Sequence, residues 1–158
     1  MVGSVNLASN LDWVYVSASP LSSDELTKWA TRPNCGAVVT FCGTVRNSST
    51  TGHEITSLEY ETSTELAEGR LLEVVGEARS RWPELGAIAV HHRVGSVELG
   101  DTTVVVAVSS AHRLEAFEAA KYLIDTVKIS VPMWKREVWE GGSAWSEETH
   151  SIVSVQQQ

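Results

Sequence analysis

Long hydrophobic runs are missing from this 158-residue sequence, and so is an export signal. No stretch approaches the roughly 18 consecutive apolar residues of a membrane-spanning helix. The opening MVGSVNLASNLDW lacks the basic segment and continuous apolar core of a secretory signal. Length and composition predict one domain at 13–150, between a frayed segment at 1–12 and a polar tail at 151–158. We expect a cytoplasmic protein that does not associate with membranes.

Cysteine is scarce, with only Cys35 and Cys42 in the chain. Both fall within one predicted strand, where a rise of about 3.3 Å per residue separates them by about 23 Å. A disulfide needs a Cα separation below about 7 Å. The two residues are therefore expected to be buried free thiols in a reducing compartment.

Zinc, calcium and phosphate-loop motifs are also absent. His91 and His92 are adjacent in a predicted strand, so their side chains point to opposite faces and cannot share a metal ion. The sequence therefore predicts no metal site.

Basic residues are few, at 12 Lys and Arg against 20 Asp and Glu, which gives a net charge of -8. This balance argues against general nucleic-acid binding, which needs a basic face. The charge is uneven, however. Residues 112–136 hold five bases and three acids, a net +2, so the remainder carries -10. A cationic segment in an acidic chain suggests a site for an anion.

Apolar periodicity predicts a mixture of strands and helices. Strands are expected at 13–16, 36–46, 55–61, 86–94 and 102–109, with an extended segment at 133–139. Helices are expected at 22–30, at 62–82 from a Thr62/Glu65 capping box, and from a serine cap at 109–113 to about Lys128.

Three of these elements carry finer predictions. In residues 36–46, apolar side chains occupy both odd-numbered and even-numbered positions, which indicates a strand covered on both faces. In the helix at 62–82, Glu68 is expected to lie away from the buried stripe. In the last helix, the predicted buried stripe contains Phe117, Ala120, Ile124 and Val127, widened by Ala116 and Leu123.

The start of the helix after Ser109 is a candidate anion site. Its free backbone N–H groups and the positive end of the helix dipole attract negative charge. His112 and Arg113 add donors suited to phosphate. An ordinary serine cap beside an exposed His-Arg pair is the plainer alternative. A nucleophilic pair of Ser110 and His112 is disfavoured, because no carboxylate or glycine elbow supports it.

Two of the four lysines, Lys128 and Lys135, flank Pro132, and Arg136 follows the second. A lysine beside other cations has its pKa lowered, which favours a nucleophile or proton donor near neutral pH. Solvated surface cations are the alternative. Arg46, at the end of a buried strand and before a polar loop, is a further candidate for ligand contact, against the reading of a solvated strand end.

Together these segments resemble the large, catalytic subunit family of molybdopterin synthase. The similarity runs from about residue 14 to residue 145 and rests on an ordered set of motifs. They lie at 36–47, 58–61, 92–95, 109–113, 116–119 and 128–137, and include Ser-Ala-His-Arg and Pro-x-Trp-Lys-Arg-Glu. The resemblance implies an α+β fold, an α/β hammerhead with an additional antiparallel β subdomain.

The resemblance also implies a function and partners. A small ubiquitin-like carrier subunit would deliver sulfur as a thiocarboxylate on its C-terminal Gly-Gly. The acceptor would be cyclic pyranopterin monophosphate (precursor Z), which becomes the dithiolene of molybdopterin in molybdenum cofactor biosynthesis. The large subunit would form a homodimer within a heterotetramer and need no cofactor of its own. A relative that only docks a Gly-Gly tail is the alternative.

By position, the resemblance assigns catalysis to Lys128 and Lys135. It implies substrate binding by a wider set that includes both lysines: Thr44, Val45, Arg46, His112, Arg113, Arg136 and Glu137. Part of each pocket would come from the second subunit of the dimer. The loop at 48–52 is richer in Ser and Thr than is usual for the family, and Cys42 receives no role in sulfur handling.

Overall fold

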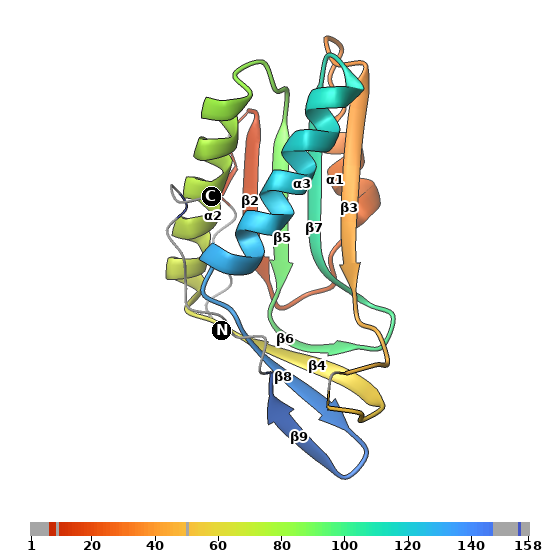
Figure 1. Ribbon diagram of the computed structural model, residues 1–158. Coiled ribbons are helices and arrows are strands. Elements are labelled where there is room, and N and C mark those ends of the chain that lie inside the picture. The colour runs from red at the N-terminus through yellow and green to blue at the C-terminus, as the bar shows by residue number, and fades with distance from the viewer. Residues whose placement is uncertain (1–6, 9, 50, 147–154, 156–158) are drawn as a thin grey trace.

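The computed structural model describes residues 7–8, 10–49, 51–146 and 155 (Figure 1). Most of the predicted frayed segment and polar tail lies outside these residues. The helices are α1 (Ser23–Ala30), α2 (Thr64–Arg81) and α3 (Arg113–Ser130). The strands are β1 (Leu7–Ala8), β2 (Asp12–Ser17), β3 (Ala37–Thr44), β4 (Ile55–Glu61), β5 (Ile88–Arg93), β6 (Gly95–Glu98), β7 (Thr102–Ser110), β8 (Trp134–Trp139) and β9 (Gly142–Trp145).

The strands form two sheets. The larger has the order β1-β2-β5-β7-β3, with β2 and β5 parallel and the other neighbours antiparallel. The smaller is antiparallel, with the order β6-β4-β8-β9, and lies across one end of the larger sheet (Figure 1). The predicted α+β class with an additional antiparallel subdomain is confirmed.

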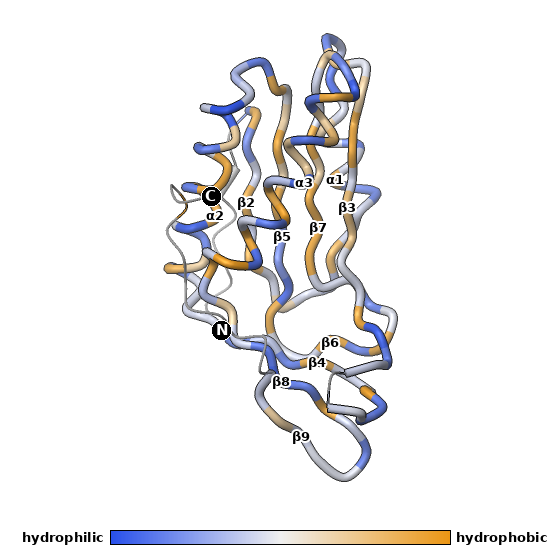
Figure 2. Tube along the Cα trace, in the orientation of Figure 1, coloured by the Kyte–Doolittle hydropathy of each residue, from blue (hydrophilic) through white to orange (hydrophobic). Residues whose placement is uncertain are grey.

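Helices cover both faces of the larger sheet. On one face, α1 packs Leu26 and Ala30 against alanines and Val105 of β5 and β7. On the other, α2 and α3 enclose the main core with β2, β5 and β7. Figure 2 shows the hydropathy that drives this layering, with apolar central strands that become polar where β5 approaches the smaller sheet. Burying apolar area on both faces fixes the position of every strand end.

The rotation of α3 differs from the sequence prediction. Its buried residues are Ala116, Ala119, Ala120, Leu123, Thr126, Val127 and Ser130, whereas Phe117 is 62% exposed. The predicted stripe was therefore wrong at Phe117, because the small alanine side chains let α3 approach the sheet closely. The serine cap was also wrong. His112 is the N-cap residue and makes no side-chain capping hydrogen bond.

The residues of β3 are half-buried or exposed throughout, so the prediction of a strand covered on both faces was wrong for a single chain, and β3 lies at the edge of the sheet. Phe41 is 38% exposed, and a register shift interrupts the pairing with β7 at Gly43/Thr44. Cys35 and Cys42 are free, as expected, but neither is buried: Cys35 is half-buried and Cys42 is exposed. Position at the sheet edge, which local patterning does not encode, explains these differences.

The start of α2 is held to a segment that is distant in the sequence, the connection between α3 and β8. Its N-cap is Ser63, without a side-chain capping bond, so the predicted Thr62/Glu65 capping box was wrong. The Thr62 hydroxyl instead donates to the carbonyl oxygen of Pro132. This long-range bond fixes the segment between α3 and β8, which is flanked by Lys128 and Lys135.

Glu68 is buried in α2, contrary to the prediction that it lies on the outer face. Its side chain is 5% exposed, and within the described residues its Oε1 has no hydrogen-bond partner. Burial raises the pKa of this carboxyl, and a backbone hydrogen bond with Val16 opposes the rise only in part. The charged form is therefore destabilised in the folded chain.

Glu68→Gln is expected to raise the free energy of unfolding near pH 7 by roughly 1 kcal/mol, since it removes a poorly compensated buried charge. Because the pKa of Glu68 is raised in the folded chain, the free energy of unfolding is not reduced by this group below its ordinary pKa of 4.5. The free energy of unfolding then falls as the pH rises through the folded-state pKa and the buried carboxyl becomes charged. The gain should therefore vanish near pH 4. Denaturant titrations at both pH values measure it. The exposed Glu73→Gln on the same helix is the control, and equal gains in both variants would contradict the assignment.

Candidate active site

The candidate site lies where α3 gives way to β8. Lys128 stands in the last turn of α3, where the helix dipole favours a cation. The helix ends at Ser130, with Val131 as its C-cap, because Pro132 cannot continue it. The chain then crosses from the larger sheet to the smaller one, so Lys128 and Lys135 come from two different layers of the fold.

Strand register decides which way the side chains of β8 point. Tyr60 of β4 pairs with Lys135, and Leu58 pairs with Glu137. Because side chains alternate along a strand, Lys135 and Glu137 share one face. Arg136 lies on the other face, where its Nε donates to Glu59 at 2.8 Å.

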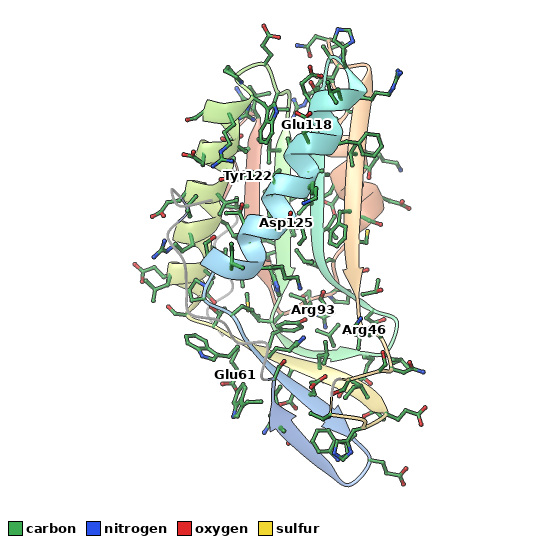
Figure 3. The ribbon with its side chains drawn as sticks, in the orientation of Figure 1. Arg46, Glu61, Arg93, Glu118, Tyr122 and Asp125 are labelled. Atoms are coloured by element: carbon green, nitrogen blue, oxygen red, sulfur yellow. The ribbon has the colours of Figure 1, made fainter. Side chains whose placement is uncertain are left out.

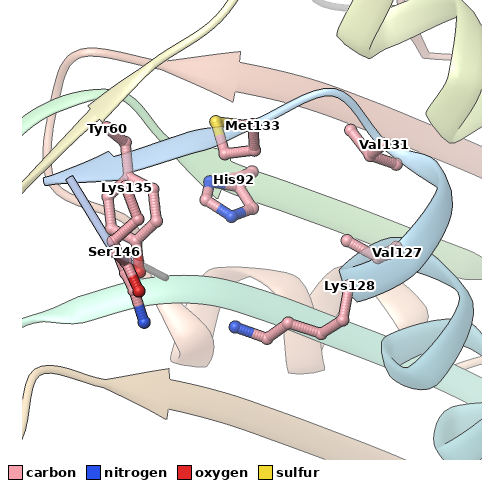
Figure 4. A pocket seen from close by; sticks show the side chains of 8 residues that line it. All are labelled: Tyr60, His92, Val127, Lys128, Val131, Met133, Lys135 and Ser146. Atoms are coloured by element: carbon pink, nitrogen blue, oxygen red, sulfur yellow. The ribbon is translucent and has the colours of Figure 1, made fainter. Parts of the chain in front are cut away.

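A cavity of about 90 Å³ opens beside the two lysines. Figure 4 shows its lining side chains, with the Lys128 and Lys135 amines directed into the same space. They are Tyr60, His92, Val127, Lys128, Val131, Met133, Lys135 and Ser146. Its small volume and aliphatic wall suit a narrow extended chain with little side-chain bulk.

A second cavity of about 240 Å³ lies against the same residues. Its lining is Gly43, Thr44, Arg46, Ser48, Ser49, Ile55, Leu58, Tyr60, Thr103, Lys128, Lys135 and Glu137. Tyr60 and the two lysines line both cavities and so separate them. The lysine amines are therefore accessible to groups bound on either side.

Charge in the second cavity favours an anion. Arg46, Lys128 and Lys135 contribute three cations against the single carboxylate of Glu137. That carboxylate accepts a hydrogen bond from the Ser49 hydroxyl at 3.1 Å. Guanidinium and ammonium groups with serine hydroxyls are the donors that bind phosphate oxygens.

The loop after β3 is held over this cavity by aromatic stacking. The ring of His53 lies parallel to that of Trp139, with centroids 3.9 Å apart and planes 6° apart. Ser48 also forms an isolated bridge with Glu54. Together with the Ser49–Glu137 bond, these contacts fix hydroxyl groups at the rim of the cavity.

His92 contributes a buried imidazole to the smaller cavity, and His91 points to the opposite face, as predicted. The pKa of His92 is lowered to about 4, chiefly by burial; the hydrogen bond to the Arg93 backbone opposes this shift, and the positive charge of Lys128 adds to it. The pKa of His91 is also lowered to about 4, by burial alone. Both rings are therefore neutral near pH 7.

The structure gathers some of the predicted site residues and separates others. Lys128, Lys135, Thr44, Arg46 and Glu137 line the cavities. Neither lining contains Val45, Arg136, His112 or Arg113: Val45 is in the core of the smaller sheet, and Arg136 faces Glu59.

His112 and Arg113 are exposed at the far end of α3. The 15 residues from Arg113 to Lys128 correspond to about 22 Å of helix. Figure 3 shows this separation, with Arg46 at the end of β3 near the smaller sheet and Glu118, close to the start of α3, at the opposite end. A single chain therefore does not bring all the predicted residues together.

Sequence reasoning missed Tyr60, His92, Met133, Ser146 and the serines of the loop. For Tyr60 a signal existed, because a β4–β8 pairing brings its side chain beside that of Lys135. The other residues reach the site only through tertiary packing, which leaves no pattern in the local sequence. His92 joins the site only through the layering of β5 beneath the α3–β8 junction.

None of the helices in the described part of the chain is long and apolar enough to cross a bilayer. Across the same residues, no three His, Cys, Asp or Glu side chains come together as metal ligands.

Comparison with protein families shows that residues 16–130 match the family model described as "MoaE protein". Molybdopterin synthase catalytic subunit from Taeniopygia guttata is 41% identical over 136 residues, which cover 86% of this chain and 87% of that protein. The protein of the same description from Thermoplasma volcanium is 44% identical over 131 residues, covering 83% and 94%.

Solved structures give the same result. Molybdopterin synthase from Staphylococcus aureus aligns with a TM-score of 0.78 and 36% identity, over 83% of this chain and 94% of that one. A chain from the complex of subunits 1 and 2 of molybdopterin-converting factor from Helicobacter pylori shares the fold, with a TM-score of 0.71, 20% identity and coverage of 87% and 92%.

Proposed function

The chain belongs to the MoaE protein family, and on that basis we propose that it is the catalytic subunit of a molybdopterin synthase. In this function it transfers sulfur from the thiocarboxylated C-terminus of a small ubiquitin-like carrier to cyclic pyranopterin monophosphate, which forms the molybdopterin dithiolene. The observation that carries the proposal is the lysine pair that lines two cavities at once.

The two cavities suit the two reactants. A Gly-Gly tail has no side chains, so it fits the narrow, partly aliphatic cavity, where the ammonium groups of Lys128 and Lys135 attract the terminal thiocarboxylate. The pterin phosphate fits the larger cavity, where Arg46 and the loop serines donate to its oxygens. Tyr60 and the lysines then lie between the sulfur donor and the acceptor.

The roles of the lysines follow from this placement. Lys128 and Lys135 hold the thiocarboxylate close to the acceptor and stabilise the negative charge that develops during transfer. Glu137 accepts a hydrogen bond from Ser49 and so positions the loop, whereas the cations of the cavity bind the anionic substrate. Sulfur comes from the carrier, so the proposed reaction needs no metal or cofactor held by this chain. We also propose that the protein acts in the cytoplasm.

The direct test uses the purified chain, thiocarboxylated carrier and cyclic pyranopterin monophosphate, with the dithiolene product measured after derivatisation. We expect product with the thiocarboxylated carrier and none with the same carrier ending in an ordinary carboxylate. Absence of product from the wild-type chain would refute the proposed function. A relative that only docks the tail would bind carrier without turnover, and the names of its relatives do not favour that reading.

A carrier-free phosphatase assay tests the remaining alternative, hydrolysis by Ser110 and His112. Ser110 is buried at the end of β7, and in the described residues no hydrogen bond joins it to His112. We therefore expect no phosphatase activity without carrier.

We further propose that the chain forms a homodimer that completes each site, within a heterotetramer with two carriers. His112 and Arg113 lie too far from Lys128 to act on the same substrate in one chain. Beside them, Leu114 and Phe117 are 61% and 62% exposed, and α3 packs against β3, which carries the exposed Phe41. A second copy that covers this apolar face would bring its cations towards the first chain's lysines.

A further inference from the structure

His92 is held at the smaller cavity by contacts from several elements. Its side chain is 4% exposed, and the ring of Tyr60 meets it edge-on with centroids 5.1 Å apart. Figure 4 shows the imidazole between Met133 and Lys128. The charged groups that line this cavity are Lys128 from α3 and Lys135 from β8, and Tyr60 of β4 is the other titratable group.

One hydrogen bond fixes the tautomer of His92. Its Nδ1 lies 2.7 Å from the carbonyl oxygen of Arg93. A carbonyl oxygen only accepts, so Nδ1 must carry the hydrogen and donate it. In the neutral ring, Nε2 is then left with a lone pair. Within the described residues the imidazole of His92 makes no other hydrogen bond, so this lone pair remains available at the cavity.

The same ring is a poor base. Its pKa is lowered to about 4, so the imidazole does not hold a proton near pH 7 and proton transfer to it from an ammonium is unfavourable. His92 therefore does not deprotonate a lysine. It offers a neutral, permanently available acceptor.

Such an acceptor solves a specific problem of this cavity. Lysine ammonium groups only donate, and their long side chains are flexible. A carboxylate would hold an ammonium but would cancel the positive charge that attracts an anionic substrate. A neutral imidazole holds the ammonium and leaves its charge intact.

From this geometry we propose that His92 is a positioning residue for Lys128, whose ammonium donates a hydrogen bond to Nε2 of His92 during turnover. The bond directs the amine into the space shared with Lys135. The inference rests on the proposed sulfur transfer for its catalytic readout, but the contact between the two side chains can be tested without that reaction.

The kinetic test compares two replacements of His92 with one of His91. His92→Phe keeps an aromatic ring against Tyr60 but cannot accept a hydrogen bond, and we expect kcat to fall by roughly 10-fold or more, the effect of one lost bond to a charged group. His92→Gln places an acceptor near the position of Nε2 and should recover much of the loss. His91→Phe alters an equally buried ring on the opposite face and should leave kcat unchanged. Equal losses in His92→Phe and His92→Gln would overturn the proposal.

The Lys128→Ala background separates positioning from a general structural effect. If His92 acts through Lys128, adding His92→Phe to Lys128→Ala should cause no further loss in residual turnover. A further 10-fold loss would contradict the proposal. If the wild-type chain formed no product, that result would count against the proposed function. The role of His92 would then be decided by the NMR titration described next.

That measurement is the NMR titration of the His92 imidazole in the folded wild-type chain and in Lys128→Met. Removing the Lys128 charge should raise the pKa of His92 from about 4, because the two positive charges repel each other, and in the neutral ring the nitrogen shifts should report the hydrogen on Nδ1. His91 is the internal control, because its pKa is lowered by burial alone. An unchanged His92 pKa, or hydrogen on Nε2, would overturn the assignment even if His92 variants failed to fold.

Discussion

Lys128→Ala is expected to lower turnover on the order of a thousandfold, the upper range for removing one preorganised charge from an active site. The reason is the position of Lys128, which lines both cavities and would therefore reach both reactants of the proposed transfer. The fold should survive, because Lys128 is exposed at the end of α3 and contributes no side chain to the core.

The measurement is dithiolene formation under single-turnover conditions, alongside carrier binding by calorimetry and thermal unfolding. Lys121→Ala is the matched control. It lies on the same helix, is exposed, and pairs with Asp125 at 2.5 Å, away from both of these cavities. Turnover by Lys128→Ala at the level of Lys121→Ala would refute the catalytic assignment.

Lys128→Arg separates two kinds of chemistry at this position. Arginine retains the positive charge but stays protonated, so it can stabilise an anion but cannot act as an amine nucleophile. Partial activity in Lys128→Arg, well above that of Lys128→Ala, would indicate an electrostatic role. Loss equal to that of Lys128→Ala, in a variant that still folds and binds carrier, would favour a nucleophilic amine or a strict geometric requirement.

Local pattern predicted most of the elements and the helix break that frames the site. The helix predicted to run to about Lys128 ends at Ser130, before Pro132, and the extended segment predicted at 133–139 contains β8. These features depend on backbone geometry within a few residues. Local sequence therefore identified the lysine pair before any tertiary contact was known.

Tertiary packing decided what local pattern could not. The rotation of α3 follows from the close approach of its alanines to the sheet, so Phe117 became exposed although it is apolar. Glu68 is buried because α2 packs over β2, where its carboxyl bonds to the backbone of Val16. His92 joined the site through the stacking of layers, and no spacing in the sequence links it to Lys128.

The proposed dimer, with sites shared between its two chains, would explain why His112 and Arg113 lie far from the lysines of the same chain, and mixed dimers test this directly. Arg113→Ala alone should be impaired on the order of a hundredfold, as expected for a lost anion contact. Two-tag co-expression with Lys128→Ala yields dimers that contain one copy of each variant. One of their two sites then combines an intact Lys128 with an intact Arg113, so these dimers should recover about half of the wild-type activity.

The control pair is Lys128→Ala with Lys135→Ala. Both lysines line the same cavities of one chain, so every site of that mixed dimer lacks one of them and no activity should return. Phe117→Asp should disrupt the apolar face, give monomers in light scattering, and reduce turnover with Lys128 intact. No recovery in the test pair, or full activity from a Phe117→Asp monomer, would each show that the site is complete within one chain. Recovery in the control pair would show that the two lysines of one site come from different chains.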